Sequence, residues 1–86
     1  MNLHEYVTEV RVHIEGKEAV ENFVKITGKY DFDIDILDKT RHYVIDAKSI
    51  MGIFSLDLSK DLIVGIQTNG PDVTRLLNDL NEFVVK

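Results

Sequence analysis

The sequence predicts an α+β domain in which helices pack against one face of a small β-sheet. Two observations carry this prediction. Four segments alternate apolar and polar residues with the period of half-buried strands, and three others repeat apolar residues at helical spacing. Their order along the chain is strand, helix, strand, strand, helix, strand, helix (βαββαβα). Because each helix has one apolar face and each strand one apolar set, a two-layer sandwich buries both.

The first strand is predicted to end before Gly16, which interrupts its alternation. The residues expected to face the core from this strand are Val10, Val12 and Ile14. A helix follows, and Gly28 is placed to end it. The apolar face of this helix consists of Ala19, Val20, Phe23, Val24 and Thr27.

Two further strands are predicted to form a hairpin around the turn Asp38-Lys39-Thr40. Aspartates alternate with the apolar residues of the earlier strand and give it an acidic outer face. The inward set of this strand is Phe32, Ile34 and Ile36. The inward set of the later strand is Tyr43, Ile45 and Ala47.

The second half of the chain begins with Ser49, which is suited to cap a short helix that reaches Leu56. The strand that follows is more apolar than the others, as an inner strand should be. Its alternating residues are Leu62, Val64, Ile66 and Thr68. The last helix begins at Gly70-Pro71-Asp72, since proline is favoured at the first helical position. Its apolar stripe comprises Val73, Leu76, Leu77, Leu80, Phe83 and Val84.

The face of the sheet opposite the helices is expected to be open to water. Polar side chains of the strands should line it. These are Arg11, His13, Asp33, Asp35 and Gln67.

Length and composition indicate one soluble domain spanning residues 1–86. The chain has 86 residues, no cysteine and a formal net charge of −5. An excess of acidic side chains repels nucleic acid and anionic lipid, so neither is expected as a partner. The first residues lack the apolar core of a secretory signal, and no apolar run approaches the roughly 20 residues of a membrane span. We therefore expect a cytoplasmic protein.

The segment from Lys48 to Leu56 resembles the regulatory-serine segment of HPr, the histidine phosphocarrier of the bacterial phosphoenolpyruvate-dependent sugar phosphotransferase system. The similarity continues without a gap to about Asp72. It includes Ser49-Ile50-Met51-Gly52, Ser55-Leu56, Lys60 and Gly70, and a separate match at Lys29-Tyr30-Asp31. The hairpin between the second and third strands is a little longer than is typical. The resemblance implies an open-faced, HPr-like sandwich, whose antiparallel four-stranded sheet has the order 1-4-2-3 and is covered on one face by three helices.

The resemblance also exposes a difference at the start of the first helix. Members with phosphocarrier activity have His-Ala-Arg-Pro there, whereas counting back from Lys29-Tyr30-Asp31 places Gly16-Lys17-Glu18-Ala19 in this chain. Gly16, at the position of the family's active histidine, has no nucleophile. Glu18 places a negative charge where a cation would stabilise phosphate. We therefore expect no phosphoryl transfer here, no enzyme activity and no cofactor.

Ser49 is the candidate phosphoacceptor. A branch of the family, the catabolite-repression HPr, lacks the histidine and keeps the serine. In Gram-positive relatives a dedicated HPr kinase phosphorylates this serine, and the product binds a transcription regulator of carbon catabolite repression. Two interpretations stay open for Ser49: a helix cap only, or a helix cap that is also phosphorylated.

A partner-binding patch is predicted around the same short helix. In HPr the equivalent positions form an exposed apolar surface that docks partner proteins. Here the patch would consist of Lys48, Ile50, Met51 and Phe54, with Ile53 and Leu56 packed inward. The preferred function is a regulatory protein–protein interaction module. The alternatives are a phosphocarrier that uses another acceptor such as His13, and an unphosphorylated scaffold domain.

No metal site is expected. Asp31-x-Asp33-x-Asp35 has the opening spacing of a calcium-binding loop. It has Ile36 where such a loop needs glycine and His42 where it needs glutamate. We interpret the three aspartates as the solvated face of a strand, and His42 and His13 as surface residues.

Overall fold

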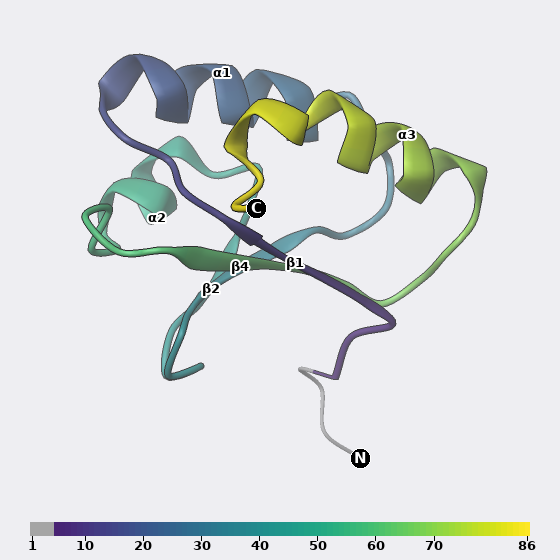
Figure 1. Cartoon of the computed structure of the whole chain (residues 1–86), viewed down its shortest axis with the longest axis horizontal. Coiled ribbons are helices and arrows are strands. Elements are labelled where there is room, and N and C mark those ends of the chain that lie inside the picture. Colours follow the sequence, from purple (N-terminus) through teal and green to yellow (C-terminus); the bar gives the residue numbers. More distant parts are fainter. Residues whose placement is uncertain (1–4) are drawn as a thin grey trace.

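The computed structural model of the chain describes residues 5–86, which form a sheet with helices on one side (Figure 1). The strands are β1 (Thr8–Val12), β2 (Asp35–Asp38), β3 (Val44–Asp46) and β4 (Leu62–Ile66). The helices are α1 (Lys17–Thr27), α2 (Ile50–Phe54) and α3 (Pro71–Asp79), followed by the 3-10 helix η1 (Asn81–Phe83).

The predicted architecture is confirmed. Over residues 5–86 the sheet has four strands in the order β1-β4-β2-β3, and each neighbouring pair is antiparallel. β4 is therefore an inner strand, which explains its apolar sequence. The C-terminal segment extends the sheet beyond β1, because Val12 and Val84 form an isolated antiparallel bridge.

The core lies between the sheet and the helices, and most residues predicted to face inward are fully buried. Phe23 of α1 packs edge-on against Phe83, with ring centroids 5.6 Å apart and planes at 83°. Thr27 is also fully buried, and its Oγ1 donates a hydrogen bond of 2.8 Å to the carbonyl oxygen of Ala47. This bond ties the end of α1 to the segment between β3 and α2.

Two residues of the predicted strand sets are exposed: Thr68, which lies beyond the end of β4, and Tyr43. Tyr43 is 64% exposed rather than buried. β3 begins only at Val44, and the backbone N–H of Tyr43 donates a 2.8 Å hydrogen bond to Asp38 Oδ1 in the turn. Asp38 also accepts bonds from the backbone and the hydroxyl of Thr40, and Arg41 has a φ of 64°. The longer hairpin therefore ends in a fixed loop, in which the strand alternation does not apply.

The face opposite the helices differs from the expectation at one place. Arg11 is exposed as predicted, but Asp35 is half-buried and Leu37 on the same face is fully buried. Figure 1 shows the β2–β3 hairpin and the segment before β1 on this side of the sheet. The face is therefore partly covered by the chain itself.

Replacing Thr27 by valine tests the hydrogen bond that joins α1 to the segment between β3 and α2. Thr27→Val should lower the free energy of unfolding by about 1–2 kcal/mol, because the Ala47 carbonyl loses a buried donor. Urea denaturation measures the change. Thr27→Ser keeps the hydroxyl, so its free energy of unfolding should fall less than that of Thr27→Val. An unchanged stability of Thr27→Val together with a loss in Thr27→Ser would mean that the methyl group, and not the hydrogen bond, matters.

Candidate functional site

Ser49 begins α2 as its N-cap, as the sequence predicts. Its backbone is extended, with φ −102° and ψ 108°, and its Oγ accepts a 3.1 Å hydrogen bond from the backbone N–H of Gly52. The Ser49 N–H donates to the Asp46 carbonyl at 3.0 Å. The Ser49 side chain is half-buried, so the hydroxyl lies at the surface but is already engaged.

α2 divides its apolar residues between the core and the solvent. Ile53 is fully buried and Leu56 is 8% exposed, whereas Ile50 is 36%, Met51 77% and Phe54 41% exposed. These last three residues are called the α2 patch below. Adjacent exposed apolar side chains of this kind are typical of protein–protein interaction surfaces.

Two contacts hold α2 in this orientation. A Cβ atom at Gly52 would lie 2.5 Å from Ile45 Cγ2, so only glycine permits this approach of α2 to β3. Lys48, predicted to belong to the partner-binding surface, lies just before α2. Its Nζ donates a 2.5 Å hydrogen bond to the Tyr30 carbonyl and its N–H bonds Asp46 Oδ1 at 2.8 Å. Lys48 therefore also joins α2 to the loop that follows α1.

The start of α1 offers no side chain that could accept a phosphoryl group at its cap position. The N-cap is Gly16, which is exposed and has a φ of 91°. Glu18 occupies the first turn, where its charge suits the helix dipole but repels an incoming phosphate. The free N–H groups of this helix end are thus present without a nucleophile at the cap, although exposed Lys17 supplies one cation beside Glu18.

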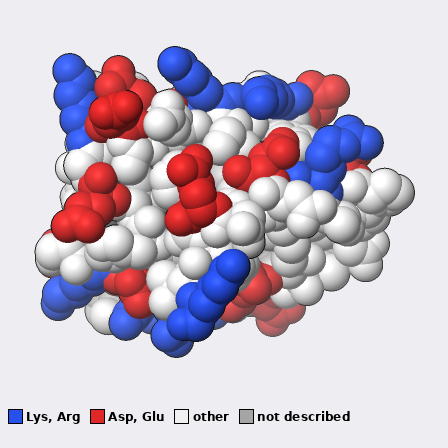
Figure 2. Space-filling model, turned by 45° about the horizontal axis from the view of Figure 1, so that its top comes forward, with Lys and Arg blue, Asp and Glu red and all other residues white. Residues whose placement is uncertain are grey.

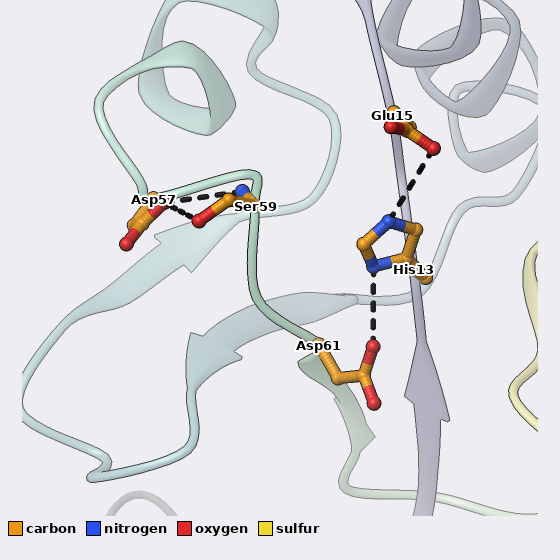
Figure 3. A network of polar contacts seen from close by, with 5 residues as sticks. All are labelled: His13, Glu15, Asp57, Ser59 and Asp61. Carbon is orange, nitrogen blue, oxygen red and sulfur yellow. Dashed lines mark hydrogen bonds and ion pairs between the residues drawn. The ribbon is translucent and has the colours of Figure 1, made fainter.

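His13 is partly exposed at the surface, and its ring takes part in polar contacts that the sequence does not reveal (Figure 3). Its Nδ1 forms a 3.1 Å hydrogen bond with Asp61 Oδ1, and its Nε2 lies 3.7 Å from Glu15 Oε2. The imidazole is 35% exposed. Both ring nitrogens therefore face carboxylates, which would repel a phosphoryl donor.

The loop between α2 and β4, which supplies Asp61, also has polar contacts of its own. Asp57 accepts hydrogen bonds from the backbone N–H of Ser59 at 3.1 Å and from its hydroxyl at 2.6 Å (Figure 3). These bonds lower the pKa of Asp57 and keep it ionised at neutral pH. The loop beyond α2 is thus acidic and internally hydrogen-bonded.

Charge, possible metal ligands and helix length in the described part of the chain bear on other classes of ligand. On the face shown in Figure 2, acidic side chains lie across the middle and basic ones mostly toward the outline. Such a face has no continuous basic surface for a phosphate backbone. Among residues 5–86, no three His, Asp or Glu side chains converge as metal ligands. No helix in that part of the chain is long and apolar enough to cross a membrane.

Replacing Gly52 by alanine tests the packing that orients α2. Gly52→Ala should lower the free energy of unfolding by about 1–3 kcal/mol, because the new methyl group overlaps Ile45 Cγ2. Urea denaturation of Gly52→Ala, of Ile45→Ala and of the double variant measures the coupling free energy between the two positions. The Gly52→Ala loss should shrink when Ile45 is alanine, and purely additive losses would contradict the proposed contact.

Comparison with known proteins agrees with this geometry. The family model described as "PTS HPr component phosphorylation site" matches residues 17–86. A crystal structure of HPr-C-His from Thermoanaerobacter tengcongensis is similar at a TM-score of 0.67 and 26% identity, covering 88% of this chain and 92% of that chain. No curated protein matches significantly. The proteins of the matched family are phosphocarriers, which interact with other proteins of the phosphotransferase system, and this chain belongs to the HPr family.

Proposed function

We propose that this chain is a non-catalytic HPr-fold interaction module, whose protein partners bind the α2 patch. One observation carries the proposal: Ile50, Met51 and Phe54 are exposed together on a helix whose Ile53 is fully buried. The resemblance to HPr supports it, because HPr proteins dock partners through the equivalent helix. As a bacterial HPr-like protein, the chain would act in the cytoplasm.

The α2 patch has the chemistry of a docking surface. Burying an exposed apolar side chain stabilises a complex by about 1.5–3 kcal/mol before the costs of association are subtracted. Met51, the most exposed of the three, is unbranched and adapts its shape to a partner. Neighbouring Lys48 adds polar contacts at the edge of the patch.

A phosphocarrier role is the weaker candidate. Gly16 replaces the histidine that the resemblance places at the start of α1, and Glu18 stands where a cation would help. His13 is the other candidate acceptor, but Asp61 and Glu15 flank its two ring nitrogens. These features support an adaptor that does not carry phosphate on histidine.

Ser49 is proposed as a regulatory phosphorylation site in carbon catabolite control. The proposed partners are a serine kinase of the HPr kinase type and a transcription regulator. A phosphate on Ser49 would add nearly two negative charges at the start of α2, where the N–H groups favour anions. The new charge would lie directly before Ile50 and would alter the docking surface. The remaining alternative is a scaffold in which Ser49 serves only as the cap.

A charge placed in the patch should abolish partner binding without unfolding the domain. Met51 is 77% exposed, so Met51→Asp should change the free energy of unfolding by less than about 0.5 kcal/mol. Recovery of partners from the native cell extract should fall about tenfold or more, because apolar contact is lost. Asn22→Asp, an equal charge change on the exposed side of α1, is the matched control. Equal recovery by both variants would place the docking surface elsewhere.

Incubation with enzyme I and phosphoenolpyruvate should give no acid-labile phosphate on this chain. The physical reason is the lack of a nucleophile at the start of α1 and the carboxylates around His13. Mass spectrometry at neutral pH measures the label, with an active HPr as the positive control. A label that disappears in His13→Gln would instead establish the alternative acceptor.

A serine kinase of the HPr kinase type, supplied with ATP, should add one phosphate to the protein. Ser49→Ala should prevent the addition, whereas Ser55→Ala, at the other end of α2, should not. Intact-mass measurement follows the reaction. If the chain with its natural sequence gains no phosphate, the scaffold interpretation is favoured.

A further inference from the structure

Tyr6 covers the side of the sheet that faces away from the helices. Its hydroxyl donates a 2.7 Å hydrogen bond to Asp35 Oδ2 on β2. Its ring lies flat over Gly65 of β4, since a Cβ atom there would be 2.7 Å from Cγ, Cδ1 and Cδ2 alike. Gly65 and Asp35 are cross-strand partners, so together they form a notch with a flat floor and an acceptor at its far end.

This notch continues into a short apolar strip. Leu37 and Ile63 are the next cross-strand pair on the same face. Leu37 is fully buried although it lies outside the main core, and Ile63 is half-buried. A second contact crosses this face: Arg41 in the hairpin donates a 2.6 Å bond to Glu9 Oε1 on β1. Side chains that arrive from both edges of the sheet, Tyr6 and Arg41, therefore make contacts on this face.

The contacts of Tyr6 within the described residues lie on the open face of the sheet. Besides the ring contact and the hydroxyl, its segment is attached by one described backbone bond, in which Val7 N–H donates to the Ile66 carbonyl at 2.9 Å. None of these contacts involves the core beneath the helices. Separation of residues 5–7 from the sheet would therefore leave that core intact.

We propose that Tyr6 is a releasable strap over a tyrosine-binding notch, and that a tyrosine side chain of a partner protein occupies the notch when the strap opens. The proposed occupant follows from Tyr6, the side chain that fills the notch in this structure. A flat ring lies on Gly65, and a hydroxyl at the end of that ring donates to Asp35, so a tyrosine side chain supplies both contacts. Burial, followed by the bond to Asp35, raises the pKa of Tyr6, so the phenol remains a donor. This surface is on the opposite side of the sheet from α2.

Native-state hydrogen exchange of the full chain tests the release. The Val7 amide should exchange about 100-fold faster than the amides of β4, and its rate should not depend on low concentrations of urea. Tyr6→Phe keeps the ring but loses the hydroxyl, and it should speed Val7 exchange while leaving β4 unchanged. Exchange of Val7 at the rate and urea dependence of β4 would show a fixed part of the fold and overturn the strap.

A small phenol tests the notch itself. p-Cresol added to Tyr6→Ala should shift the amide resonances of Gly65 and Asp35 saturably, whereas toluene, lacking the hydroxyl, should bind roughly tenfold more weakly. The double variant Tyr6→Ala/Gly65→Ala should not respond, because its new methyl group fills the floor of the notch. Equal binding of p-cresol and toluene, or binding by the double variant, would contradict the proposed chemistry.

The partner is tested with a defined probe. A capped tripeptide containing tyrosine should compete with p-cresol for Tyr6→Ala, and its phenylalanine analogue should compete weakly. A failure of the tyrosine peptide would overturn the proposed occupant. The chain with its natural sequence could instead dimerise as its concentration rises, and Tyr6→Ala could abolish the dimer. That result would identify a second copy of this chain as the occupant, in place of a different partner protein.

Discussion

Close packing of α2 against β3 is the constraint on which the exposed surface of this domain depends. Gly52 lets the helix approach Ile45 so closely that no larger residue fits. With the helix held there, Ile53 enters the core, and Ile50, Met51 and Phe54 must remain outside. The patch is thus a geometric consequence of a buried contact. An apolar surface retained in this way, in a chain that is otherwise rich in charge, supports the proposed docking role of the patch.

The start of α1 lies in an environment of the opposite electrostatic character from a phosphoryl-transfer site. Helix N-termini attract anions, yet Glu18 already supplies a negative charge in the first turn. The neighbouring imidazole of His13 is held between Asp61 and Glu15. Three carboxylates therefore lie near this helix end, where Lys17 is the cation of the first turn. The local charges and the glycine at the cap both support the proposal of an adaptor that does not carry phosphate on histidine.

Periodicity predicted the fold well because each element buries one regular set of residues, as the alternation before Gly16 and the stripe after Pro71 show. It failed where side chains follow other rules. Tyr43 belongs to a turn organised by Asp38, so strand alternation misplaced it. The partner of His13 lies 48 residues away in sequence, and no local pattern could reveal it. The ring of Tyr6 over Gly65 was equally hidden, since both residues look unremarkable until strand order is known.

The same packing bears on how modification of Ser49 would act. Its Oγ already accepts the Gly52 N–H, and a phosphate oxygen could accept that bond in its place. α2 is held separately by Ile53 in the core and by Gly52 against Ile45. The helix would therefore stay where it is, and the change would be one of charge beside Ile50. A partner that binds by apolar contact would lose affinity, while one with a cation opposite Ser49 would gain it. Phosphorylation would in that case select between partners rather than switch the shape of the domain.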